Sequence, residues 1–410
     1  MAGKRFYGLI GEKLGHSFSP AIHGKLADYE YRLIELTPEE LGPFLQMGQF
    51  QGLNVTIPYK KAVIPYCAEL TPQARHIGSV NTILRRPDGT LLGHNTDYYG
   101  FAYLLRSAGA EVAKKKALVL GTGGASLTVH AVLRDLGTRE RVTISRTGPD
   151  NYGNLERHAD AQIIVNTTPV GMYPNTGKAP LDLSRFPKLE GAFDLIYNPA
   201  KTQFLLDAEK LGVRNANGLG MLVAQAKAAA EMFLDRPIPD ERVDEIIREM
   251  ERNTRNLMLI GMPGCGKTTV GQALAQRLGR KLVDTDVLIE EEAGRTIPEI
   301  FAQDGEEAFR RLEHEILCRV SRESGLVIAT GGGVVTRPEN LDPLRQNSTV
   351  IFLRRPLDQL PVDGRPVSQA NNLETLYQRR LPLYQQASDW AVDNIVLDDT
   401  ITEIMRRFSK

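Results

Sequence analysis

Residues 257–268 read LMLIGMPGCGKT, an apolar run followed by a loop that fits the pattern G-x-x-x-x-G-K-[ST] at every fixed position. The run predicts a buried strand, and we expect a helix over 269–278. In such a strand, loop and helix unit, the glycines let backbone N–H groups surround a phosphate at the positive end of the helix. The stretch therefore predicts an α/β fold with a site for nucleotide phosphates.

Two side chains of this loop have roles that follow from phosphate chemistry. Lys267 is expected to reach the terminal phosphates of ATP, and Thr268 to ligate Mg²⁺. Cys265 is either a redox-sensitive thiol or a small residue that contributes only its backbone, and we favour the second interpretation. The loop does not identify the phosphate acceptor, and the guanine-specific pattern Asn-Lys-x-Asp is missing from the sequence. The predicted ATP-binding residues of this region are Gly264, Cys265, Gly266, Lys267, Thr268 and Thr269.

Short β-branched runs alternate with helical segments along the rest of the chain, for example at 117–120, 163–165 and 350–353. Such alternation is typical of α/β architecture with parallel sheets. A charged helix is expected to end near Glu251, before the polar residues 252–256. We therefore expect a domain boundary near 250–255 with a short linker.

Length, charge and cysteine content limit the classes of function that we expect for this chain. The 410 residues predict two to four domains at about 100–200 residues each. Lys and Arg total 50 and so do Asp and Glu, so no excess positive charge is available for nucleic acid or an anionic membrane. The three cysteines are scattered without metal-ligand spacing, which favours a cytoplasmic location and no structural zinc. We expect neither a signal peptide nor a membrane span, and small-molecule chemistry is the favoured function class.

Five further motifs follow the phosphate loop in order. They are DTD at 284–286, FRRLE at 309–313, TGGG at 330–333, GRP at 364–366 and RRLPLY at 379–384. In order and spacing they closely resemble shikimate kinase, over about residues 255–410. A hydroxy-acid acceptor needs cations for its carboxylate and carboxylates for its hydroxyls, and these motifs supply both.

The resemblance implies a role for each kinase residue. Arg310 and Arg380 would grip the substrate carboxylate, Asp286 would orient the attacking hydroxyl as a catalytic residue together with Lys267, and Arg365 would close over ATP. The residues implied for the kinase substrate are Asp286, Arg310, Gly331, Gly332, Gly333 and Arg380. The residues implied for Mg²⁺ are Thr268 and Asp284. The stretch between 353 and 365 is shorter than this family leads us to expect.

A second glycine-rich turn, GTGGAS at 121–126, stands between a strand at 117–120 and a helix that we expect to end near 136. Such a turn is typical of a Rossmann-type dinucleotide site. The next strand ends in Ser145-Arg146-Thr147, where an NAD site would have an acidic residue. Because Arg146 would neutralise a 2′-phosphate, we expect NADP(H) in preference to NAD.

Seven motifs surround this turn. They are HSFSP at 16–20, NVTIPYK at 54–60, VNT at 80–82, NTD at 95–97, NTTPVGM at 166–172, DLIY at 194–197 and NGLGMLVAQ at 217–225. Their succession closely resembles shikimate dehydrogenase, over about residues 5–250. Residues 148–151, directly after Thr147, lack the further arginine that this family leads us to expect, which predicts a weaker hold on NADP. The stretch 147–163 is also short, which predicts a trimmed cofactor domain.

Hydride delivery to a ring ketone leaves an alkoxide that needs a proton, and a lysine paired with an aspartate is a suitable donor. Lys60 and Asp97 are the predicted catalytic pair. The resemblance implies these substrate-binding residues: Ser17, Ser19, Thr56, Lys60, Asn81, Asp97, Tyr197 and Gln225. The predicted NADP-binding residues are Gly121, Thr122, Gly123, Gly124, Ala125, Ser145, Arg146, Thr147, Leu195 and Gly218.

Alternatives exist for several of these residues. Serine is a preferred helix N-cap residue, which is an alternative role for Ser17 and Ser19. Asparagine is frequent in turns, which is an alternative for Asn81 and Asn95. Lys60 taken alone would be expected at the surface. The convergent set of roles favours the catalytic interpretation.

The predicted fold class is α/β. An N-terminal substrate domain (1–100 and 219–250) and a Rossmann-type NADP domain (101–218) precede a P-loop kinase domain (254–410) with a parallel sheet flanked by helices. The resemblances together imply reduction of 3-dehydroshikimate and phosphorylation of shikimate by one monomeric or homodimeric chain. Two alternatives remain open: the first half uses NAD on quinate or shikimate, or one half is a non-catalytic ligand-sensing module.

Overall fold

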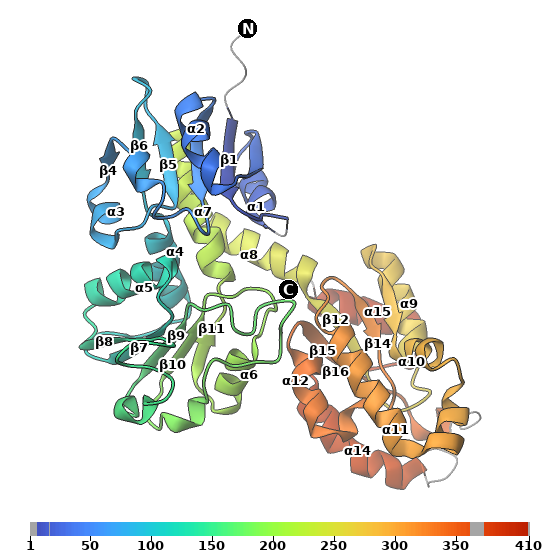
Figure 1. Cartoon of the computed structure of the whole chain (residues 1–410). Coiled ribbons are helices and arrows are strands. Elements are labelled where there is room, and N and C mark those ends of the chain that lie inside the picture. The colour runs from blue at the N-terminus through green and yellow to red at the C-terminus, as the bar shows by residue number, and fades with distance from the viewer. Residues whose placement is uncertain (1–5, 16, 361–372, 409–410) are drawn as a thin grey trace. The chain divides into compact units, whose positions relative to one another are not determined.

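The computed structural model describes residues 6–15, 17–360 and 373–408. It contains three separate sheets in two compact units. The first unit comprises residues 1–170, 179–197 and 207–248, and the second comprises 171–178, 198–206 and 249–410. Figure 1 shows the two sheets of the first unit, one above the other, and the single sheet of the second.

The first sheet has the strand order β2-β1-β3-β5-β6-β4. Its elements are β1 (Phe6–Gly11), α1 (Ser19–Leu26), β2 (Tyr31–Glu35), α2 (Pro38–Met47), β3 (Phe50–Val55), η1 (Ile64–Tyr66), β4 (Glu69–Leu70), α3 (Pro72–Ile77), β5 (Thr82–Arg85) and β6 (Leu91–His94). The prediction of parallel sheets throughout is wrong here, since β5 runs antiparallel to both β3 and β6. The reason is local: a tight turn at 86–90 joins β5 to β6, and such a short connection permits only an antiparallel pair.

The second sheet, β11-β10-β9-β7-β8, is wholly parallel. Its elements are α4 (Asp97–Ser107), β7 (Lys116–Leu120), α5 (Gly124–Asp135), β8 (Glu140–Ile144), η2 (Leu155–His158), β9 (Ile163–Asn166), η3 (Leu183–Arg185), β10 (Gly191–Asp194), α6 (Gln203–Lys210), β11 (Arg214–Ala216) and α7 (Leu219–Leu234). All five residues of β7 are buried, as expected for the centre of a parallel sheet. The connection from β8 to β9 contains only the 3₁₀ turn η2, which agrees with the predicted trimming.

Helices α4 and α7 pack against each other within the first unit. Gly100 of α4 permits this approach, because a Cβ there would lie 2.5 Å from the carbonyl oxygen of Met221 and 3.0 Å from Cβ of Gln225. The contact brings the start of α4, which carries Asp97, close to Gln225 of α7.

The charged helix α8 (Glu241–Thr254) continues further than the sequence predicts. Only Arg255 separates its last residue from β12 (Asn256–Ile260). The prediction that this helix ends near Glu251 is therefore wrong: residues 252–254 form its last turn, where the Thr254 hydroxyl donates a 2.8 Å hydrogen bond to the carbonyl of Met250.

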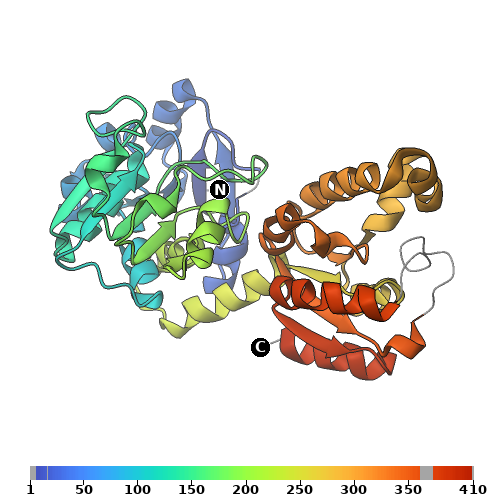
Figure 2. The ribbon, with the colours of Figure 1, turned by 90° about the horizontal axis from the view of Figure 1, so that it is seen from below.

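The third sheet, β13-β14-β12-β15-β16, is parallel and has β12 at its centre. Helices lie on both faces, α9 and α15 on one and α12 and α14 on the other (Figure 2). The remaining elements are α9 (Lys267–Leu278), β13 (Leu282–Asp284), α10 (Thr285–Ala293), α11 (Ile297–Val320), β14 (Val327–Ala329), η4 (Val334–Thr336), η5 (Pro338–Asn340), α12 (Leu341–Arg345), β15 (Ser348–Arg354), η6 (Leu357–Gln359), α14 (Leu373–Ala387), β16 (Trp390–Asp393) and α15 (Leu397–Phe408).

Candidate active sites

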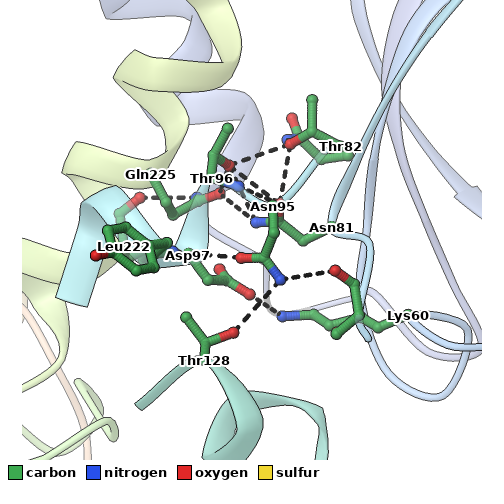
Figure 3. Close-up of polar contacts among 12 residues, drawn as sticks. Lys60, Asn81, Thr82, Asn95, Thr96, Asp97, Thr128, Leu222 and Gln225 are labelled. Atoms are coloured by element: carbon green, nitrogen blue, oxygen red, sulfur yellow. Dashed lines mark hydrogen bonds and ion pairs between the residues drawn. The ribbon is translucent and has the colours of Figure 1, made fainter. Parts of the chain in front are cut away.

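Lys60 and Asp97 form an ion pair in the first unit, with Nζ 2.5 Å from a carboxylate oxygen (Figure 3). Lys60 lies in the turn after β3, and Asp97 is the first residue of α4. The side chains are only 18 % and 8 % exposed. Lys60 and Asp97, which lie 37 positions apart in the sequence, are therefore in contact as predicted, and the pair is shielded from bulk water.

A network of amides and hydroxyls lies beside this pair (Figure 3). The side-chain oxygen of Asn81 accepts a 2.7 Å hydrogen bond from the Thr96 backbone, and its amide group donates to Gln225 at 3.4 Å. Gln225 is oriented by its 2.8 Å bond to the carbonyl of Leu222. Asn81, Asp97 and Gln225, predicted from three separate motifs, are thus brought together in a setting that suits a hydroxylated ligand.

Sequence reasoning missed Thr96 and Asn95 as members of this network. Asn95 donates to the carbonyl of Ser79 at 2.9 Å and to the hydroxyl of Thr128 at 3.4 Å, so it connects the site to α5. Both residues belong to the motif NTD that carries Asp97. Their position directly before a predicted catalytic residue could have identified them as members of the site.

Between Ser17 and Ser19, Phe18 packs against Tyr197, a predicted substrate-binding residue, with the two ring centroids 5.4 Å apart. The Ser17 hydroxyl accepts a 3.2 Å bond from the backbone of Ser19. Helix α1 has no side-chain cap, so neither serine acts as its N-cap residue. Thr56 lies against Gly11, where a Cβ would approach the threonine methyl group to 2.7 Å.

The glycine-rich turn at 121–126, the predicted dinucleotide site, leads into α5 next to the Lys60–Asp97 pair. A Cβ on Gly124 would lie 3.4 Å from the Ser79 hydroxyl and 3.6 Å from Cδ of Lys60. Gly121 has a φ of +107°, which favours glycine. Among the described residues, no atom would lie within 4 Å of a Cβ on Gly123, so this face of the turn is not packed against them.

The remaining predicted cofactor residues follow three strands of the second sheet: 145–147 follow β8, Leu195 follows β10, and Gly218 lies between β11 and α7. Ser145 accepts a 2.8 Å bond from the backbone of Gly148. Arg146 is exposed and forms no ion pair with any residue in the described part of the chain, so its charge is available to an anion. Gly218 packs against the carbonyl of Leu195, and a side chain at this glycine would overlap that group.

The second unit has a cavity of about 540 Å³ at the carboxyl edge of its sheet. The phosphate loop contributes Lys267, which is buried and donates 3.0 Å hydrogen bonds to the carbonyls of Gly261 and Met262. The other predicted site residues in its lining are Gly264, Gly266, Thr268, Thr269, Asp284, Asp286, Arg310, Gly331, Gly332, Gly333 and Arg380. The buried Cys265 contributes its carbonyl to a 2.7 Å bond from Asn394. Arg365 lies outside the described residues.

Thr268 and Asp284 form the candidate Mg²⁺ site. The threonine hydroxyl donates to a carboxylate oxygen of Asp284 at 2.7 Å, and the other oxygen accepts from the backbone of Asp286 at 3.0 Å. Both groups are hard oxygen donors. Mg²⁺ is commonly held by one or two such protein groups together with the phosphates of a substrate, so this pair fits the ion.

Asp286 and Glu313 each direct one carboxylate oxygen toward Gly331. A Cβ on this glycine would lie 2.7 Å from Oδ1 of Asp286 and 2.6 Å from Oε1 of Glu313. Among the described residues, neither oxygen has a hydrogen-bond partner. Burial raises the pKa of Asp286 to about 6, helped by the charges of Asp284 and Glu313. Asp286 is thus a carboxylate whose basicity is higher than usual.

Glu313 is a member of the site that sequence reasoning missed, although the motif FRRLE contains it. Its second oxygen accepts a 2.7 Å bond from Arg310, which also donates to Glu306 at 3.0 Å. Arg380 donates to the carbonyl of Gly332 at 3.1 Å. A Cβ on Gly333 would overlap the Arg310 guanidinium. The glycines therefore let Asp286, Glu313 and Arg310 lie close to the backbone.

The folds and the two sites define an enzyme that joins a dinucleotide-dependent oxidoreductase to a P-loop phosphotransferase. Sequence families match both parts: the shikimate dehydrogenase substrate binding domain at residues 9–83 and shikimate kinase at residues 263–409. The chain belongs to the shikimate dehydrogenase family and carries a shikimate kinase domain in the same polypeptide. Both resemblances found from the motifs are confirmed.

Relatives and solved structures agree on the first part. The shikimate dehydrogenase (NADP(+)) of Clostridium perfringens strain 13 is 35% identical over 268 residues, which are 60% of this chain and 98% of the relative. That of Oleidesulfovibrio alaskensis is 40% identical over 271 residues, or 60% of this chain and 95% of the relative.

The solved structure of a chorismate mutase/shikimate 5-dehydrogenase fusion protein from Clostridium acetobutylicum has 38% identity and a TM-score of 0.58, covering 61% of this chain and 98% of its own. Shikimate 5-dehydrogenase from Thermus thermophilus, in complex with NADP(H) and shikimate, has 31% identity and a TM-score of 0.55, covering 60% of this chain and 99% of its own. No helix in the described ranges is long and apolar enough to cross a membrane.

Proposed function

We propose that this chain reduces 3-dehydroshikimate to shikimate with NADPH and then phosphorylates the 3-hydroxyl of shikimate with ATP and Mg²⁺. The observation that carries the proposal is the buried Lys60–Asp97 pair beside the Gly124 turn, in a chain that also has a phosphate-loop cavity. The product of the first reaction is the substrate of the second, which supports both assignments.

In the proposed reduction, bound NADPH supplies the hydride. Lys60 donates a proton to the oxygen that becomes negatively charged, and Asp97 holds the ammonium group in place. Asn81, Thr56 and Gln225 bind ring hydroxyls, and the segment of Ser17 and Ser19 holds the carboxylate. The low exposure of the pair keeps competing water away from the transferred proton.

In the proposed phosphorylation, Asp286 accepts the proton of the attacking hydroxyl, and Lys267 stabilises charge on the phosphates. Thr268 and Asp284 hold Mg²⁺. Arg310 and Arg380 bind the substrate carboxylate, and the glycines at 331–333 admit the ring. Lys267 lies on the carbonyls of its own loop, from which it can move to a phosphate oxygen by side-chain rotation.

The kinase should depend on pH through Asp286. Because the pKa of this buried carboxyl is raised to about 6, kcat/KM for phosphorylation is expected to fall as the pH decreases through that value. The protonated acid cannot accept the hydroxyl proton. The measurement is a profile of kcat/KM between about pH 5 and 8, with the reductase profile of the same sample as reference. A kinase profile that stays flat below pH 6 would contradict the assigned role.

Cofactor preference should depend on Arg146. Replacing it with Ala removes an exposed cation that has no ion-pair partner among the described residues, and we expect kcat/KM with NADPH to fall about tenfold while the value with NADH changes little. Arg139→Ala is the matched control, since Arg139 precedes the amino end of β8 and pairs with Asp160 at 3.4 Å. A native preference for NAD would instead favour the alternative in which the first half oxidises quinate or shikimate.

The whole proposal is tested by incubating the chain with 3-dehydroshikimate, NADPH and Mg-ATP and measuring shikimate 3-phosphate. Accumulation of shikimate without its phosphate would support the alternative that the second half only senses ligands. If NADPH is not consumed in the presence of 3-dehydroshikimate, the proposed reductase activity is wrong.

We propose three domains, at 1–100 with 219–250, at 101–218 and at 254–410, each with one of the three sheets. We further propose a cytoplasmic chain that is a monomer or homodimer. Three free cysteines support the reducing location.

A further inference from the structure

Arg355 lies directly after β15 and lines the kinase cavity. Its Nε atom is buried and, among the residues that the structure describes, has no hydrogen-bond partner. Within the described part of the chain, its guanidinium forms no ion pair either. A buried donor of a charged group without an acceptor costs free energy that an anionic ligand would recover.

The other cations of this cavity have partners. Lys267 donates to two loop carbonyls, Arg310 to Glu313 and Glu306, and Arg380 to the carbonyl of Gly332. Arg310 and Arg380 already account for the carboxylate of the proposed acceptor. Arg355 is therefore a further cation that the proposed chemistry has not used.

The sheet places Arg355 on the nucleotide side of the cavity. In the pairing of β12 with β15, Ile260 lies opposite Phe352, and the carbonyl of Leu353 contacts the position of the first loop glycine, Gly261. The glycines at 331–333 follow β14, which lies on the other side of β12. The carboxyl end of β15 thus borders the phosphate loop, and it lies across β12 from the glycines at 331–333, where the proposed acceptor would bind.

We propose that Arg355 binds the polyphosphate of the nucleotide in the kinase reaction. The inference rests on the proposed kinase function and adds a residue to it. The fork of N–H donors on a guanidinium matches phosphate oxygens. The stretch from 353 to 365 is shorter than the family leads us to expect, and Arg355 supplies a cation from the strand end itself.

The test measures equilibrium binding of ADP, AMP and shikimate to the full chain by calorimetry. Arg355→Gln is expected to weaken ADP binding about tenfold, to weaken AMP binding less, and to leave shikimate binding unchanged. Arg355→Lys should retain part of the ADP affinity. The control is Arg354→Gln: this neighbouring arginine is 45 % exposed and pairs with Asp393 at 2.8 Å, outside the cavity lining.

Unchanged ADP affinity in Arg355→Gln, or an equal loss in Arg354→Gln, would overturn the inference. So would a loss of shikimate binding in place of ADP binding, because the anion would then be the acceptor carboxylate. An equal loss for AMP and ADP would also overturn it, since the contact would not be to the polyphosphate. Because the proposed reductase site also binds shikimate, folding of the kinase domain is read from AMP binding that persists in the Arg355→Gln variant, and Arg355→Lys decides the question if the Gln variant does not fold. If the native chain neither binds ADP nor phosphorylates shikimate, the proposed kinase function fails instead.

Discussion

Replacing Lys60 with Met should lower the rate of 3-dehydroshikimate reduction by about 10²–10⁴-fold, the range that general acid catalysis contributes. Met keeps the apolar stem of the side chain but removes the ammonium group that lies 2.5 Å from Asp97. No other cation forms an ion pair with this carboxylate within the described residues, so nothing replaces the proton donor. The kinase rate of the same sample should not change.

The controls for this variant separate chemistry from folding. Lys61→Met changes an exposed neighbour and should keep full reductase activity. Binding of NADP⁺ to the Lys60 variant should persist, which would show that the unit is folded although Asp97 has lost its partner. A Lys60 variant that folds, binds the cofactor and reduces at the native rate would contradict the catalytic role.

Replacing Lys267 with Met should lower the kinase rate by at least about 10²–10³-fold, as expected when a group that stabilises transition-state charge is lost. The ammonium group is buried beside the loop, where its interaction with a phosphate is weakly screened. Coupled assays should then show shikimate accumulating at the native rate without its phosphate.

Lys281→Met is the matched control, because Lys281 is an exposed lysine of the same domain that lies before β13. It should leave both rates unchanged. If either active-site change, at Lys60 or at Lys267, abolishes both activities, the two sites are not independent and the proposed division of labour is wrong.

Much of each site could be predicted because its residues lie in short motifs with local geometric requirements. The loop glycines at 264 and 266 have φ values of +79° and +95°, conformations that glycine adopts readily. Asp284 caps α10 through a bond to the backbone of Asp286, two residues later. Such features depend on neighbours in the sequence, and periodicity and spacing therefore reveal them.

Other features could not be predicted, because they depend on partners that are distant in sequence. Glu313 belongs to the kinase site only because β14 brings Gly331 against it and against Asp286. Asn95 joins the reductase network through Thr128 of α5. The extension of α8 to Thr254 was also missed, since the polar residues there fit a linker as well as a solvated helix.

The amino-acid sequence alone was enough to predict a phosphate loop, a dinucleotide turn and the motifs of two consecutive enzymes. Local backbone chemistry and side-chain order suffice for that conclusion. Two features became visible only in the folded chain: Lys60 meets Asp97 beside Gly124, and Arg355 lines the kinase cavity without a partner among the described residues. The physical reason is that strand order and helix packing set these distances, and neither is encoded in the spacing of any single motif.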